Sequence, residues 1–188
     1  MKEQLQKDFD NIIKNLSLSQ RDTEIKQFYL DNFINKGFPN RRDENWKFSD
    51  LNQIIKKNIG ELSFYNDYTS TSKVDTSVFV DGLEHNKIVF INGRIEKIDF
   101  NYEKKDQIEI IDKSENINKF NNNNSLSDLN NAFTNKSFKI VVKNGYQLIK
   151  PLIIYHITNS DIWSKNINLR LDFELGKDSS LRLIDLYN

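Results

Sequence analysis

The chain has 188 residues, enough for one sizeable domain or for a small helical module joined to a β module. Its 27 Lys and Arg residues balance 27 Asp and Glu residues, which argues against nucleic acid or an anionic membrane as the main partner. The absence of cysteine excludes a disulfide, a thiolate nucleophile and cysteine ligands for zinc or an iron–sulfur cluster. No apolar stretch approaches the length of a membrane span, so we expect a soluble, cytoplasmic protein.

The first third of the sequence predicts helices. Apolar residues between positions 5 and 16 recur at helical spacing, which indicates a first helix. A second helix is predicted from about Ser19, a good N-cap residue, to about Asn35. Gly37 suits the position after a helix end, and Pro39 then stops the helix.

The stretch "GFPNRRDENWKFSDL", residues 37–51, joins this helix to a third one. Ser49 is the expected N-cap of the third helix, and Asp50 is placed favourably against the N-terminal dipole. Trp46 is expected to pack in the angle between the two helices. The charged residues between them are interpreted as a solvated joint with weak local ion pairs.

Short strands are predicted from about residue 74 onward. The segment 87–98 indicates a hairpin, because Asn92-Gly93 suits the positive φ angles of a type I′ turn. Residues 113–124 are polar and rich in Asn, as in a connection. A short helix is expected over 125–133, with Ser125 as its cap.

The last fifty residues contain four strand candidates, at 138–142, 151–158, 167–175 and 181–187. In the third, apolar and polar residues alternate strictly, which predicts one buried and one solvated face. Such strands with polar corners suit a sandwich, a jelly roll or a β-helix. The predicted class is therefore α+β, with a helical module (1–62), short strands with a hairpin and an Asn-rich connection (63–124), and a short helix with the start of a β core (125–188).

Residues of the 37–51 stretch match a family motif. The stretch resembles the motif of SufD-type members of the SufB/SufD family, which are scaffold subunits of the SUF iron–sulfur cluster assembly machinery. The residues that carry this resemblance are Gly37, Pro39, Glu44, Asn45, Trp46, Lys47, Phe48 and Ser49. Segments 89–94, 129–133, 148–158 and 169–185 resemble later parts of the family pattern in the same order.

The resemblance implies the N-terminal portion of such a subunit, with the first coils of a right-handed parallel β-helix truncated at the C-terminus. It implies a non-enzymatic scaffold that works with SufB-like and SufC-like subunits. We expect neither a nucleic acid nor a membrane as a partner. The iron–sulfur cluster and ATP are implied only for the wider complex, so we expect no cofactor, no metal ligand and no catalytic residue in this chain. The motif residues are interpreted as structural.

Other interpretations stay open at the level of sequence. His156 lies within an apolar strand and His85 within a turn-like segment, and neither has further ligands at metal-binding spacing. Asp172 and Glu174 share the polar face of one strand, as in a β-helix enzyme acting on carbohydrate. A free-standing interaction module is the third possibility.

The resemblance generates one binding prediction. The family segment that docks the SufC ATPase has no counterpart in these 188 residues, so the chain by itself is expected not to bind that ATPase. A pull-down of a SufC-like protein with the tagged chain measures this, and tight binding would contradict the prediction.

Overall fold

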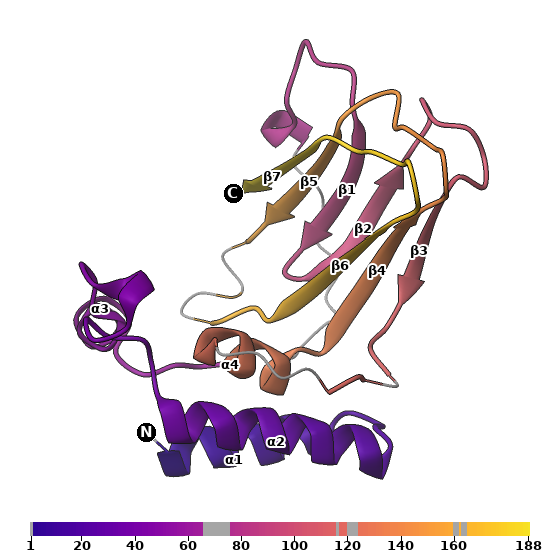
Figure 1. Ribbon diagram of the computed structural model, residues 1–188. Coiled ribbons are helices and arrows are strands. Elements are labelled where there is room, and N and C mark those ends of the chain that lie inside the picture. The colour runs from indigo at the N-terminus through magenta and orange to yellow at the C-terminus, as the bar shows by residue number, and fades with distance from the viewer. Residues whose placement is uncertain (1, 66–75, 116, 120–123, 160–161, 163–164) are drawn as a thin grey trace. The chain divides into compact units, whose positions relative to one another are not determined.

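The computed structural model describes residues 2–65, 76–115, 117–119, 124–159, 162 and 165–188 (Figure 1). Over these ranges, four α-helices and two β-sheets confirm the predicted α+β class. The helices are α1 (Lys2–Lys14), α2 (Gln20–Lys36), α3 (Leu51–Asn58) and α4 (Ser125–Phe133). The strands are β1 (Asn86–Ile91), β2 (Arg94–Asp99), β3 (Ile108–Asp112), β4 (Lys136–Val142), β5 (Leu152–Ile157), β6 (Leu169–Leu175) and β7 (Leu183–Tyr187).

The chain forms two compact units, each built from segments that are distant in sequence. Unit 1 consists of Met1–Asn66, Lys113–Asn135 and Ser164–Arg170, and unit 2 consists of Asp67–Asp112, Lys136–Trp163 and Leu171–Asn188. Helix α4 therefore belongs to the same unit as the three N-terminal helices. The sequence-based boundaries at 62 and 124 follow chain order instead. Part of the Asn-rich segment, residues 120–123, lies outside the described residues.

The ends of α2 follow the sequence prediction. The Ser19 hydroxyl oxygen accepts a hydrogen bond from the backbone N–H of Asp22 at 3.0 Å, as an N-cap should. At the other end, Gly37 has a φ of 74° and donates its N–H to the Phe33 carbonyl at 2.6 Å. A positive φ is easily adopted only by glycine, so Gly37 ends the helix as expected.

The predicted caps of the other two helices are wrong by one residue. Asp50, not Ser49, caps α3 and accepts from the Gln53 N–H at 3.2 Å. Asn124, not Ser125, caps α4 and accepts from the N–H groups of Leu126 and Ser127. In both cases two adjacent residues can cap, and the one with extended backbone just before the first turn takes the role.

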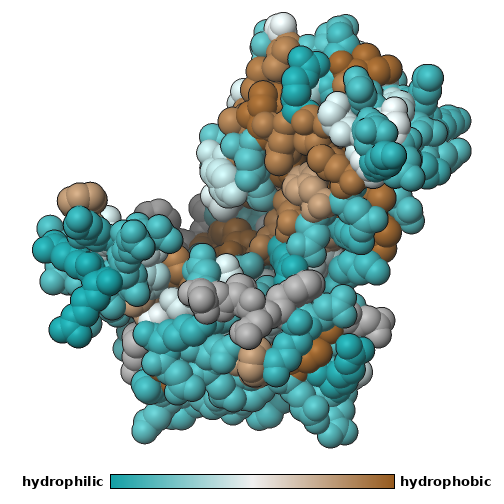
Figure 2. Space-filling view, in the orientation of Figure 1, coloured by the Kyte–Doolittle hydropathy of each residue, from teal (hydrophilic) through white to brown (hydrophobic). Residues whose placement is uncertain are grey.

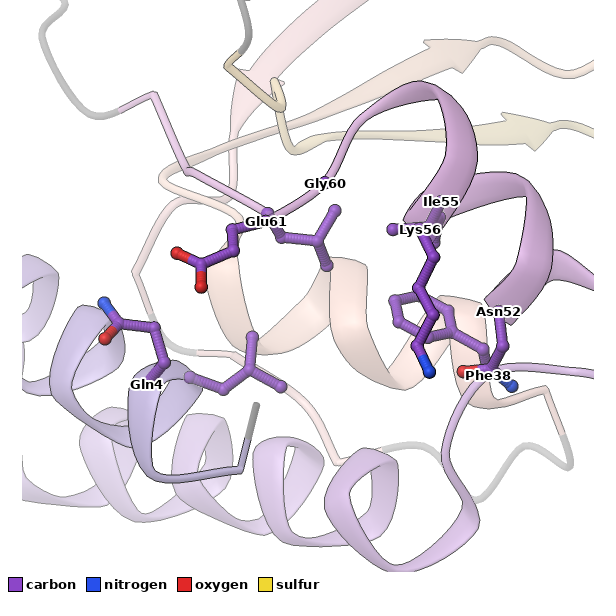
Figure 3. A pocket seen from close by; sticks show the side chains of 9 residues that line it. Gln4, Phe38, Asn52, Ile55, Lys56, Gly60 and Glu61 are labelled. Atoms are coloured by element: carbon purple, nitrogen blue, oxygen red, sulfur yellow. The ribbon is translucent and has the colours of Figure 1, made fainter.

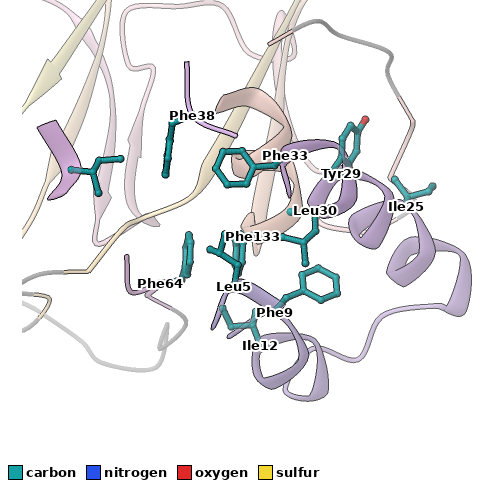
Figure 4. Packing of buried hydrophobic residues seen from close by; sticks show 12 residues of the cluster. Leu5, Phe9, Ile12, Ile25, Tyr29, Leu30, Phe33, Phe38, Phe64 and Phe133 are labelled. Atoms are coloured by element: carbon teal, nitrogen blue, oxygen red, sulfur yellow. The ribbon is translucent and has the colours of Figure 1, made fainter. Parts of the chain in front are cut away.

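An aromatic core holds unit 1 together (Figure 4). The ring of Phe64 stacks on that of Phe133 with centroids 3.6 Å apart, and Phe9 meets Phe133 edge-on at 6.1 Å. Phe133 is the last residue of α4, so this contact joins α1, α4 and the segment after α3. The other buried members of the core are Leu5, Ile12, Ile25, Tyr29, Leu30, Phe33, Phe38, Ile55 and Ala132.

Lys26 of α2 is buried in the same unit, with only 2% of its surface exposed. Its ammonium donates hydrogen bonds to the carbonyl of Asn131, at 3.3 Å, and to that of Thr134. These carbonyls end α4, where a positive charge meets the negative end of the helix dipole. Burial lowers the pKa of Lys26 from 10.5 to about 8, partly opposed by the charge of Asp22.

The larger sheet of unit 2 has the strand order β2-β1-β5-β7. β1 and β2 form the predicted antiparallel hairpin, with Asn92 at a φ of 49° and Gly93 at 80° in its turn. β5 runs parallel to β1 on one side and to β7 on the other. The residues that face one another across these three strands include Phe90, His156 and Tyr187.

The smaller sheet has the order β3-β4-β6, and the corners that follow its strands lie against each other. The Lys177 N–H donates to the Asn144 side-chain oxygen at 2.8 Å, and Gly145 N–H donates back to the Lys177 carbonyl at 2.7 Å. A Cβ at Gly176 would lie 2.5 Å from the Asn144 nitrogen, so this close approach requires glycine.

The burial of β6 differs from the prediction. Its alternating sequence predicts a buried apolar face, yet no residue of the strand is buried and Leu175 is 48% exposed. β6 is one of the two edge strands of its sheet, and both of its faces remain partly exposed. An alternating pattern records which residues share a face and does not show that a second layer covers that face.

Glu103 fastens the loop after β2 to the corner before β5. Its carboxylate accepts hydrogen bonds from the Tyr146 hydroxyl and the Asn86 amide, both at 2.6 Å, and from the N–H groups of Ile149 and Lys150, both at 3.1 Å. Partial burial alone would raise the pKa of Glu103, but these four donors outweigh it and lower the pKa. Burial and the Glu103 carboxylate together raise the pKa of Tyr146.

The buried Lys26 predicts a specific pH dependence of stability. Because its pKa is about 8 when folded and 10.5 when exposed, the unfolded chain binds more protons between these values and stability rises with pH there. Relative to Lys26→Met, the unfolding free energy of the wild type should rise by about 1–2 kcal/mol between about pH 7.5 and about pH 9.5. Urea unfolding measures this, with exposed Lys14→Met as the control that shows no such rise. A difference independent of pH would contradict the prediction.

Candidate functional site

The first residues of the motif segment belong to the core of unit 1. Phe38 is 4% exposed, and its ring meets that of Phe33 edge-on with centroids 4.9 Å apart. Pro39 is also buried. Gly37 lets the chain leave α2 at the angle that places Phe38 in the core. Phe38 and Pro39 therefore contribute to the core of unit 1.

The charged part of the motif is a turn held by its own side chains. The Asp43 carboxylate accepts from the Asn40 N–H at 2.8 Å, and the Asn40 side-chain oxygen accepts from the Arg42 N–H at 3.0 Å. A short 3₁₀ turn, Glu44–Trp46, follows. Glu44 and Asn45 are exposed. These contacts lie within the turn itself, so the exposed charged side chains of the motif are not part of the core.

The aromatic residues of this segment differ in exposure. Trp46, the expected anchor between the helices, is half-buried. Phe48 is 91% exposed, with the Lys47 ammonium 5.9 Å from its ring centroid. A phenyl ring that is almost fully in water stabilises no fold, and exposed apolar groups of this kind mark interaction surfaces.

A pocket of about 170 Å³ lies beside α3 in the same unit (Figure 3). Its apolar part is formed by Leu5 of α1, Phe38, Ile55 of α3 and Leu62. The remaining lining residues are Gln4, Asn52, Lys56, Gly60 and Glu61. An apolar pocket with a polar surround suits an apolar side chain or an apolar ligand group.

In unit 2, three rings stack across successive parallel strands. His156 lies 5.4 Å from Phe90 and 4.5 Å from Tyr187 between ring centroids, with 8° between the ring planes in both pairs. Asp185 holds two of these rings in place, because its two carboxylate oxygens form hydrogen bonds with His156 Nε2 at 2.8 Å and with the Tyr187 hydroxyl at 2.9 Å. Partial desolvation of its hydroxyl, and then the hydrogen bond to the Asp185 carboxylate, raise the pKa of Tyr187. His156 is thus a packed strand residue, and Tyr187 at the end of the stack is 74% exposed.

His85 lies in the loop before β1, where a turn residue was expected, but it is buried. Its Nδ1 is 2.6 Å from the Leu83 carbonyl, and its Nε2 is 2.8 Å from the Tyr155 hydroxyl. The same hydroxyl accepts from the Val80 N–H at 3.1 Å. Both ring nitrogens are therefore engaged in holding the loop against β5.

One carboxylate of β6, that of Glu174, takes part in a contact between strands. Glu174 forms an ion pair with Lys139 of β4, which is the neighbouring strand. Across the described ranges, no three His, Asp or Glu side chains are grouped as a metal site. Among the helices in those ranges, none has the length and apolar character needed to cross a membrane.

The fold and these surfaces define an α+β protein that presents an exposed aromatic motif in one unit and an open sheet edge in the other. Comparison with known proteins found no matching family model and no matching curated protein. The resemblance to the SufB/SufD family therefore depends on the motif residues themselves.

Sequence reasoning placed the motif but missed the outward position of Phe48 and the pocket beside α3. One signal was present: Lys47, Ser49 and Asp50 surround Phe48 with polar residues, which is unusual for a core position. The pocket had no such signal, because its lining comes from α1, α3 and two connecting segments.

The two phenylalanines of the motif separate folding from surface function. Phe38→Ala removes a buried ring and should lower the unfolding free energy by about 3–5 kcal/mol. Phe48→Ala removes an exposed ring and should change it by less than about 0.5 kcal/mol. Denaturant unfolding of both variants measures the difference, and a large loss in Phe48→Ala would show that this ring supports the fold.

Proposed function

We propose that the chain is a SufD-like, cytoplasmic, non-enzymatic scaffold subunit that serves iron–sulfur cluster assembly together with SufB-like and SufC-like proteins. The observation that carries the proposal is the motif from Gly37 to Ser49, in which part of the matching residues build the core and part remain on the surface. Glu44, Asn45, Lys47 and Phe48 are all exposed, as side chains that meet a partner must be.

The strand arrangement supports the β-helix part of the proposal. β1, β5 and β7 pair in parallel, and β4 and β6 are neighbours in the second sheet. Gln147 and Ser180, which form a parallel bridge, lie 33 positions apart in sequence. Asn144 and Lys177, which bond each other in the same connections, have the same separation, and the paired residues of β5 and β7 are 31 positions apart. Similar separations along neighbouring segments are expected for successive coils of a parallel β-helix.

The proposal assigns shape and contact surface to this chain and assigns chemistry to its partners. Cluster ligands and ATP binding belong to the other subunits, since the chain contains no cysteine thiolate to offer a cluster. The surfaces available for contact are the outward motif residues and the edge strands β6 and β7. On those edges Leu175, Leu183 and Tyr187 are exposed, which suits continued strand pairing.

Co-purification tests the proposal most directly. The open reading frame that contains this chain is expressed with a tag beside SufB-like and SufC-like proteins from the same genome. We expect both to be retained, whereas an equally tagged, unrelated parallel β-helix protein should retain neither. Recovery equal to that control would contradict the scaffold assignment.

A cellular assay gives an independent measurement of the same proposal. In bacteria that lack their own SufD, the open reading frame and its two partner genes should restore the activity of an iron–sulfur enzyme. Failure to restore this activity while the three proteins still associate would restrict the role to binding and contradict a part in cluster assembly.

A further inference from the structure

The exposed ring of Phe48 and the pocket beside α3 both belong to unit 1. Phe48 stands three residues before α3, and the pocket is lined by residues of α1, of α3 and of the segments that precede and follow α3. One molecule therefore presents both an exposed apolar side chain and an apolar recess.

The pocket has the size and chemistry for a phenyl ring. Its volume is about 170 Å³, and a protein cavity of about 150 Å³ lined by Leu, Ile and Phe binds benzene. Here the apolar wall consists of Leu5, Phe38, Ile55 and Leu62 (Figure 3). The Phe38 ring offers the edge or face that an incoming aromatic ring prefers.

The charges around the two features are complementary. Phe48 is flanked by the cation Lys47 and by the anion Asp50 two residues on. The pocket is surrounded by one cation, Lys56, and one anion, Glu61. A Phe48 side chain that enters the pocket of another molecule can therefore bring charges of opposite sign together on both sides.

We propose that two copies of this chain associate through unit 1 by exchanging their Phe48 side chains, each of which enters the pocket of the other copy. Because each copy supplies both a ring and a pocket, the exchange is reciprocal and closes as a two-fold dimer. Ile54 and Ile59, on and after α3, are exposed and add apolar area to unit 1, while the face over α1 and α2 in Figure 2 is mainly hydrophilic. The proposal does not depend on the scaffold function, since it is argued from the exposed ring and the pocket and not from the family motif.

The expected dimer is weak. Two phenyl rings and a small apolar border bury less than the roughly 1,200–2,000 Å² of a stable complex, so the dissociation constant should be on the order of 10–100 μM. Sedimentation velocity from about 5 to about 500 μM covers this range. The wild-type sedimentation coefficient should rise with concentration over this series.

Three variants separate the proposed contact from other association. Phe48→Ala removes the ring, and Asn52→Trp covers the pocket; each should weaken association by at least about tenfold. Tyr187→Ala removes a similarly exposed aromatic residue from unit 2 and should leave the dimer unchanged. Circular dichroism melting of each variant verifies that the fold persists, and Phe48 is so exposed that its removal should not perturb it.

Cross-linking then tests the arrangement itself. Since the chain has no cysteine, a Lys47→Cys chain mixed with a Glu61→Cys chain provides one thiol on each side of the contact. Oxidation should join the two different chains more efficiently than either chain with itself. A wild type that stays monomeric, an equal effect of Tyr187→Ala, or no preference for the mixed pair would each overturn the proposal.

Discussion

The packing of α4 against α2 is the contact on which unit 1 depends. α4 comes from residues 125–133, far along the chain, and supplies the Phe133 ring on which Phe9 and Phe64 pack. Lys26 of α2 completes the junction by bonding the carbonyls at the end of α4, in a setting that excludes water. A buried ammonium is tolerated only because those carbonyls and the helix dipole replace its hydration. The apolar wall of the pocket, including Leu5 and Phe38, is part of the same core.

Local signals predicted most of the secondary structure. The helical spacing of apolar residues placed α1 and α2, Ser19 and Gly37 marked the ends of α2, and Asn92-Gly93 marked the hairpin. These features depend on backbone preferences within a few residues, so they can be predicted from a single sequence. The caps of α3 and α4 shifted by one residue because Asp50 and Asn124 compete with adjacent serines for the same role.

Non-local features could not be predicted in this way. Lys26 looks like a solvated helix residue until α4, about a hundred positions later, covers it. The alternation in β6 correctly groups its side chains by face, yet burial of a face requires a second layer that the pattern does not encode. The pocket likewise combines α1, α3 and two connections, and it exists only once Phe38 has been placed by the core.

A motif can be retained for folding, for contact or for both, and this chain divides the two roles between neighbouring residues. Gly37, Phe38 and Pro39 are needed to turn the chain out of α2 and to fill the core. No such need explains Phe48, because a ring that is 91% exposed contributes little to the folded state. The surface half of the motif is therefore the half in which a partner, whether another subunit or a second copy, has to be sought.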